Sequence, residues 1–236
     1  MKLSEVFKGL TYGELSNIRC GGKKEGGIYP TYTDEVLYYV NQALVQLHTR
    51  FELKKNEVII QLHEEVSLYR LTSAHAYSNE ASNEYYKYID DLGQYPFTDD
   101  IIKVDRVYNE LGNELIINNN TAECTIYTPE YNLLHVTNAE DTNALSLVYS
   151  ARHDELELDI GETPDDIEVH IQPSLLHPLG LYVAYLAYNS LGGNENVGIA
   201  LGKLQQFEAY CLQIETLGTL NKDNHTNNRL LKKGWV

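Results

Sequence analysis

The stretch Leu175–Gly193, LLHPLGLYVAYLAYNSLGG, decides how the chain is expected to fold. It contains no Asp, Glu, Lys or Arg, and tyrosines recur at every third position from Tyr182 to Tyr188. A membrane-spanning helix needs about 20 mainly apolar residues, whereas a His-Pro pair and an Asn-Ser pair interrupt this run. We therefore interpret it as a helix that stops at Gly192–Gly193 and must be covered by protein on more than one side. No membrane association is predicted.

Helical patterns also flank this run in the sequence. Residues 33–51, TDEVLYYVNQALVQLHTRF, carry apolar side chains at spacings of three and four, which predicts an amphipathic helix buried through Leu37, Val40, Leu44, Leu47 and Phe51. His48, near the end of this helix, is interpreted as a cation that the negative helix terminus favours. Residues 194–217 predict a second helix with its own stripe, made of Val197, Leu201, Leu204, Phe207 or Glu208, Cys211 and Ile214.

The middle of the chain changes to a strand pattern. Residues 57–62 and 66–71 are strand-like, Gly112–Asn113 marks a hairpin, and Leu145, Leu147 and Tyr149 alternate with smaller residues. Residues 72–97 are polar and rich in tyrosine, which predicts a long loop with at most a helical turn.

The order of these patterns predicts an α+β fold: a helical bundle formed by the N-terminal helix and a C-terminal helical hairpin, with an inserted β-rich region. The expected division is a helical core domain of residues 1–51 and 172–220, a β-rich insertion of residues 52–171, and a C-terminal tail of residues 221–236.

The net charge of the chain narrows the classes of function that the protein can have. The 236 residues include 34 acidic and 18 basic side chains, a net charge of −16, which argues against binding nucleic acid by neutralising phosphates. The charge is uneven, because residues 221–236 carry a net +3 and the rest therefore −19. Residues 154–168, DELELDIGETPDDIE, hold eight acidic side chains and no basic one.

Signs of catalytic chemistry are sparse. Three cysteines, far apart in sequence, argue against a disulfide scaffold and against a zinc site. His63, Glu64 and Glu65 are adjacent, but a metal site needs further ligands and no known metal motif includes them, so a solvated strand edge is the more common outcome. No nucleophile motif is present. We therefore predict no catalytic residues, no metal and no cofactor, and a protein that is not an enzyme.

Three stretches resemble one family, the head-to-tail adaptor (connector) proteins of tailed bacteriophages, including the tail tubular protein A type. They are VLYYVNQALVQLHTRFELKKNEVIIQL at residues 36–62, FTDDIIKVDRVYNELGNEL at 97–115, and IQPSLLHPLGLYVAYLAYNSLGGNENVGIALGKLQQFEAYC at 171–211. The resemblance lies in the order and composition of the elements. The Gly-rich segment 20–27 and the loop 72–97 depart from the family pattern.

The resemblance implies a virion structural protein that assembles in the host cytoplasm. It implies a ring, usually of 12 copies, that extends the DNA channel below the portal protein and joins a tail tube or nozzle protein. DNA would pass through the lumen without specific binding, as an acidic body would allow. Another tail-completion, stopper or tail tube component, or a metal-dependent enzyme using His63 and Glu65, remains an alternative.

Within this framework the sequence offers three sets of candidate residues. The helix at 175–191 is expected to serve both the core and the subunit interface, through Tyr182, Ala184, Tyr185, Leu186 and Tyr188. The tail is expected either to be a disordered terminus or to dock on the portal through Leu230, Leu231, Trp235 and Val236. The acidic segment is expected to be either a solvated loop or a channel lining formed by Asp154, Glu155, Glu157, Asp159, Asp165 and Asp166.

Overall fold

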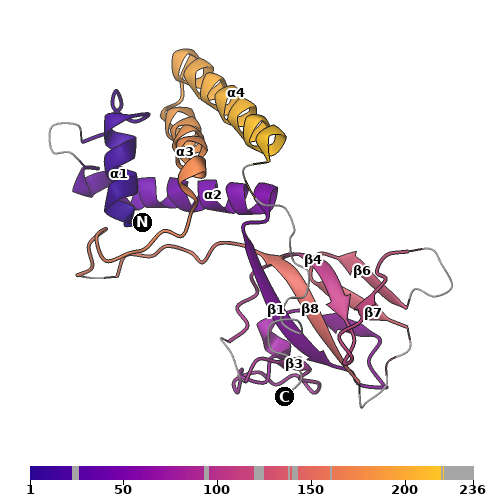
Figure 1. Cartoon of the computed structure of the whole chain (residues 1–236). Helices are drawn as coiled ribbons and strands as arrows, with labels where there is room; N and C mark the ends of the chain where they lie inside the picture. Colours follow the sequence, from indigo (N-terminus) through magenta and orange to yellow (C-terminus); the bar gives the residue numbers. More distant parts are fainter. Residues whose placement is uncertain are drawn as a thin grey trace, which may run out of the picture. The chain divides into compact units, whose positions relative to one another are not determined.

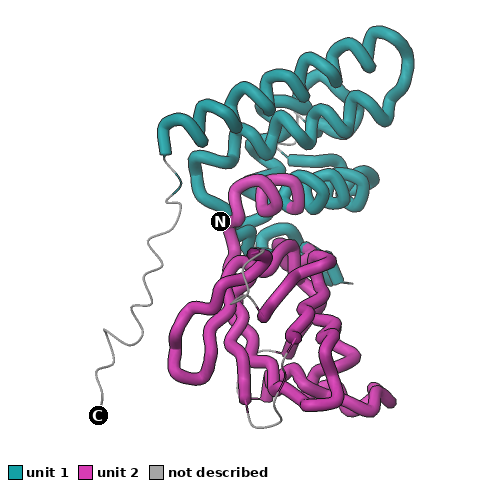
Figure 2. Tube along the Cα trace, turned by 90° about the vertical axis from the view of Figure 1, so that its right-hand side faces the viewer, with its two compact units in different colours: residues 1–44, 156–236 teal, residues 45–155 magenta. Residues whose placement is uncertain are grey.

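The protein has an α+β fold (Figure 1). The structure, a computed structural model, describes residues 1–22, 27–92, 96–119, 125–137, 139, 143–159, 161–218 and 220. These residues form four α-helices and two antiparallel sheets, which confirms the predicted fold class. The chain divides into two compact units, one of residues 1–44 and 156–236 and the other of residues 45–155 (Figure 2).

The first unit is helical. Its elements are α1 (Leu3–Tyr12), the first part of α2 (Thr33–Phe51), α3 (Leu176–Leu191) and α4 (Asn194–Leu217), with short 3-10 turns before α2 and α3. The apolar stripe predicted for α2 is confirmed, because all five of its side chains are buried. The predicted stop after α3 is also confirmed: Gly192 has φ 66°, a backbone angle that glycine adopts without steric cost.

Residues 156–171 belong to the helical unit, although the sequence grouped them with the β-rich insertion. The Asn41 side chain of α2 donates to the Leu156 carbonyl at 2.9 Å and accepts from the Leu156 amide at 3.0 Å. Farther along, the Leu3 amide donates to the Ile167 carbonyl at 3.0 Å. These long-range hydrogen bonds to the backbone of the acidic segment attach it to α1 and α2, and sequence periodicity does not reveal them.

The second unit contains both sheets. One sheet has the strand order β3-β1-β8-β4-β5 and the other β2-β7-β6. The strands are β1 (Lys54–Gln61), β2 (Leu68–Arg70), β3 (Ile89–Asp90), β4 (Ile101–Tyr108), β5 (Glu114–Leu115), β6 (Ile126–Glu130), β7 (Leu133–Val136) and β8 (Ala144–Ala151). The predicted hairpin is confirmed, since Val107 pairs with Leu115 around a turn in which Gly112 has φ 78°. The alternation in β8 is confirmed by the burial of Leu145, Leu147 and Tyr149.

Buried side chains from both sheets form one hydrophobic cluster, to which the tyrosine-rich loop contributes. Within residues 72–97 the predicted helical turn is present at Ser73–His75, but β3 was not expected. Tyr88 precedes β3 and is 2% exposed, with its ring stacked on His75 at 4.5 Å and edge-on to Tyr69 at 5.0 Å. The loop is therefore part of the core of its unit.

Candidate functional site: the outer surface of the helical hairpin

Helix α3 is largely enclosed within its own unit. Ala184 is fully buried and Tyr188 is 8% exposed, while Tyr182, Tyr185 and Leu186 are half-buried. The Tyr182 ring lies 5.0 Å from Phe207 of α4 and 5.5 Å from Tyr185. At least part of the aromatic surface predicted to meet another subunit is therefore used inside the chain.

Three helices supply this cover. Besides the Tyr182–Phe207 contact, His177 at the start of α3 packs edge-on against Tyr210 of α4, with ring centroids 4.4 Å apart. A Cβ atom placed on Gly180 would lie 3.7 Å from the Leu10 side chain of α1, an ordinary packing distance. At the other end of α3, Ser190 and Tyr39 of α2 are close enough for the serine to influence the pKa of the tyrosine. The cover that the apolar sequence of α3 demands is thus supplied by α1, α2 and α4.

Helix α4 is different, because its buried stripe is narrow. Ala200, Phe207, Cys211 and Ile214 are buried, so the predicted stripe is confirmed at Phe207, Cys211 and Ile214. The prediction was wrong for Val197 and Leu201, which are 37% and 52% exposed. The buried positions are spaced at seven, four and three residues and fall on one line of the helix. Ala200 lies on this line, and Val197 and Leu201 lie to one side of it.

The exposed apolar side chains of α4 form what we call the α4 outer surface. Its members are large, each at least 37% exposed, and they lie on both flanks of the buried stripe: Val197, Ile199, Leu201, Tyr210, Leu212 and Leu217. Sequence analysis missed this surface, although α4 contains more apolar residues than one stripe accommodates. Large exposed apolar side chains in this number, here on two sides of one helix, commonly mark protein–protein contacts.

The six acidic candidates for a channel lining are all exposed. Asp154 and Glu155 belong to the β-rich unit, and the other four to the helical unit. Two of the latter have local roles: Asp165 accepts a hydrogen bond from the Ser4 hydroxyl, and Asp166 accepts from the Thr163 amide at 2.9 Å and from its hydroxyl at 2.8 Å. The Thr163 bonds lower the pKa of Asp166, which keeps this side chain ionised.

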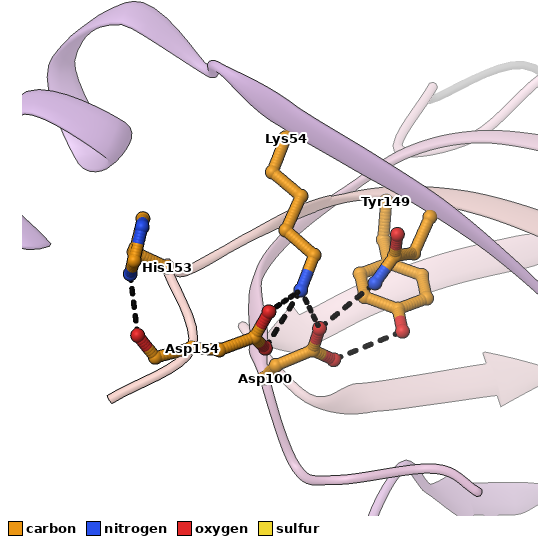
Figure 3. A network of polar contacts seen from close by, with 6 residues as sticks. Lys54, Asp100, Tyr149, His153 and Asp154 are labelled. Atoms are coloured by element: carbon orange, nitrogen blue, oxygen red, sulfur yellow. Dashed lines mark hydrogen bonds and ion pairs between the residues drawn. The ribbon is translucent and has the colours of Figure 1, made fainter. Parts of the chain in front are cut away.

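A polar network occupies one end of the larger sheet (Figure 3). The Lys54 ammonium on β1 lies between two carboxylates, 2.8 Å from Asp154 and 3.7 Å from Asp100 (Figure 3). Asp100 is 4% exposed and also accepts hydrogen bonds at 2.9 Å from the Tyr149 hydroxyl and the Asn56 amide. Burial, with the Asp100 charge, raises the pKa of Tyr149, so its proton stays on the hydroxyl. This arrangement satisfies buried polar groups and links β1 and β8 to Asp100, just before β4.

Next to this network lies a buried histidine pair. His48 and His153 are 3% and 9% exposed, and their rings meet edge-on at 5.1 Å. Burial, together with the neighbouring His153, lowers the pKa of His48 to about 4. The interpretation of His48 as a helix-terminal cation was therefore wrong: at neutral pH its ring is neutral, because desolvation outweighs the helix dipole.

The other chemical candidates do not assemble into a centre. The His63 ring packs 5.3 Å from Tyr86, whose hydroxyl donates to Glu65. Within the described ranges, no three His, Cys, Asp or Glu side chains gather as metal ligands do. No described helix combines the length and the apolar character needed to cross a bilayer. The portal-docking candidates Leu230, Leu231, Trp235 and Val236 lie outside the described residues.

The comparisons with known proteins add no assignment: no protein-family model matches the chain, and no curated protein matches it.

Proposed function

We propose that the chain is a virion structural protein, a head-to-tail adaptor that forms a ring of 12 copies below the portal of a tailed phage. The observation that carries the proposal is the α4 outer surface. Six large apolar side chains exposed on one helix of 24 residues favour a partner that covers them. In a ring this partner is the neighbouring copy, so α3 packs inside the subunit and α4 between subunits.

The proposal also assigns a role to the helical bundle, the β-rich unit, the acidic segment and the C-terminal tail. The helical bundle of α2 with the α3–α4 hairpin is the rigid body of each subunit, and the β-rich unit offers a second surface to a tail tube or nozzle protein. The exposed acidic segment lines the channel, where its charge repels phosphate over about 8–10 Å at physiological salt. Residues Leu230, Leu231, Trp235 and Val236 attach to the portal, and no catalytic step is assigned.

Electron microscopy of the purified protein mixed with the portal protein tests this function. We expect a ring stacked coaxially on the portal. Leu201→Glu should prevent it without unfolding the subunit, whereas Gln205→Glu, a charge at an exposed polar position of the same helix, should leave it intact. A ring that joins a tail component but not the portal would favour the alternative of a tail-completion or stopper protein. Failure to form or join any ring would contradict the proposal.

A further inference from the structure

A pocket of about 250 Å³ opens in the helical unit between α1 and the first turns of α3. Its floor is apolar, formed by the buried side chains of Val6, Leu10 and Leu179. Small-molecule sites usually measure about 300–1,000 Å³, so this pocket suits one large side chain better than a cofactor.

Three glycines line the pocket and leave space in it, because they carry no side chains. Gly9 lies within α1, and a Cβ atom placed there would meet no atom within 4 Å. Glycine costs roughly 1 kcal/mol relative to alanine inside a helix, so the open space at Gly9 is not explained by the needs of α1. Gly13, just after α1, and Gly180 of α3 also line the pocket.

The rim carries two carboxylates, one of which is already paired with a lysine. Glu5 and Glu14 both line the pocket. Glu5 accepts the Lys2 amide at 3.1 Å, and Glu14 accepts a hydrogen bond from Lys203 of α4. An apolar floor with carboxylates at its edge suits a large apolar side chain that has a cation nearby in sequence.

One segment of this chain has that chemistry. Residues 229–236, RLLKKGWV, combine three basic side chains with Leu230, Leu231, Trp235 and Val236, in a protein whose net charge is −16. Trp is the largest side chain and is frequent at binding hot spots, and Trp235 is the one tryptophan of the sequence.

The course of α4 brings this segment close to the pocket. Tyr210 of α4 contacts His177, a residue of the pocket wall, with ring centroids 4.4 Å apart. Helix α4 ends seven residues later at Leu217, about 10 Å along its axis at 1.5 Å per residue. From there, 12 residues separate Leu217 from Leu230, and an extended chain of that length spans about 40 Å. The reach is ample.

We propose that the pocket between α1 and α3 binds the segment Leu230–Val236 of the same chain, with Trp235 on the apolar floor and Lys232 or Lys233 near the Glu5 and Glu14 carboxylates. The bound state holds the segment on the free subunit, from which a partner with a better apolar surface would release it. This inference concerns the free subunit and does not rest on the proposed ring.

Fluorescence of Trp235 in the intact chain tests this site directly, since no other tryptophan contributes. The wild-type protein should emit at shorter wavelength than a peptide of residues 221–236, and acrylamide should quench it several-fold less. Gly9→Leu fills the pocket and should shift emission and quenching to the values of the free peptide. The matched control is Gly198→Leu on α4, where a Cβ atom also meets no atom within 4 Å. It should behave as the wild type does.

Circular dichroism of Gly9→Leu checks that α1 remains folded. If α1 does not remain folded, Glu5→Gln decides instead: it should raise quenching about two-fold, whereas Glu195→Gln on α4 should not.

The proposal would be overturned if Trp235 of the wild-type protein were quenched as strongly as the tryptophan of the free peptide. It would also be overturned if none of the pocket variants changed the emission. A shift that appears only as protein concentration rises would overturn the same-chain assignment, because it would place the segment of a second copy in the pocket. Ring formation on the portal is measured separately, so failure here leaves the proposed function standing.

Discussion

The two units differ in what they bury and what they expose. The β-rich unit holds six of the seven buried polar or charged residues of the described chain. Three of them, Asp91, Asp100 and Ser150, have hydrogen-bond partners within the unit. The helical unit instead carries the α4 outer surface, where large apolar side chains face away from the core. Buried polar groups with internal partners need nothing further, whereas exposed apolar ones gain from a partner. Both units expose large apolar side chains, but in the helical unit six of them lie on one helix, which favours α4 as the place where the chain associates.

The largest effect is expected from a charge inside α3. Ala184→Glu places a carboxylate at a fully buried position that is covered by neighbouring helices. An unpaired buried charge costs more than about 4 kcal/mol, so the helical unit should unfold. Thermal unfolding followed by circular dichroism measures this. A variant that melts near the wild-type temperature would contradict the description of α3 as enclosed, and would place Ala184 on a surface like that of α4.

A smaller loss is expected in the polar network of the β-rich unit. Asp100→Ala removes the acceptor of Tyr149 and Asn56 and a charge partner of Lys54, which should lower the free energy of unfolding by about 3 kcal/mol. Asp154→Ala is the matched control: its side chain is 76% exposed, and surface ion pairs contribute about 1 kcal/mol or less. Urea titration separates the two. Equal losses would show that burial does not strengthen this network.

Acid should destabilise the β-rich unit through His48. Its pKa in the folded protein is about 4, below the ordinary value of 6.5, so the unfolded chain binds the proton more readily. The stability from keeping His48 neutral is complete above pH 6.5 and is lost as pH falls from 6.5 to 4. We expect a loss of about 2 kcal/mol after allowance for solvent screening. His48→Leu should flatten that part of the pH profile in urea titrations, and an unchanged slope would show that His48 is charged or exposed.

Sequence patterns predicted where helices and strands lie more reliably than they predicted which side chains those elements bury. Helix α2 buries all five residues of its predicted stripe, but Val36, Tyr39, Ala43 and His48 are buried as well, so spacing identified only part of its buried surface. Helix α4 has apolar residues on both flanks, and only packing within the unit decides that Ala200 is buried while Val197 and Leu201 are exposed. Strand β4 was predicted as a strand, but two shifts in its pairing with β8 put Ile101, Val104 and Val107 on the core side at intervals of three. Such bulges break the two-residue period that a sequence reveals.

The candidate site residues likewise include some that sequence patterns predicted correctly and some whose surroundings those patterns could not reveal. The sequence indicated that α3 must be covered on several sides and predicted a bundle with α2 and α4, but it did not predict the contribution of α1. His48 illustrates a second limit, because its place at a helix end is visible in the sequence and its burial beside His153 is not. The acidic side chains were predicted to be exposed in either of their two roles, and exposure alone does not choose between them.

The smallest effect on stability is expected on the α4 outer surface. Leu201→Glu with Leu212→Glu adds charge at positions that are 52% and 60% exposed, so the free energy of unfolding should change by less than about 0.5 kcal/mol per site. Gln205→Glu with Gln213→Glu is the control, since both glutamines are exposed on the same helix. Equal melting temperatures for both variants would establish that any change in association does not come from unfolding.

Mass photometry of these two variants and the wild type, each mixed with the portal protein, tests the central claim most directly. We expect the wild type and the glutamine control to add many copies to each portal, while the Leu201→Glu, Leu212→Glu variant stays monomeric at the same concentration. If the leucine variant assembles as the wild type does, the α4 outer surface is not the contact between copies, and the proposed ring loses the observation that carries it.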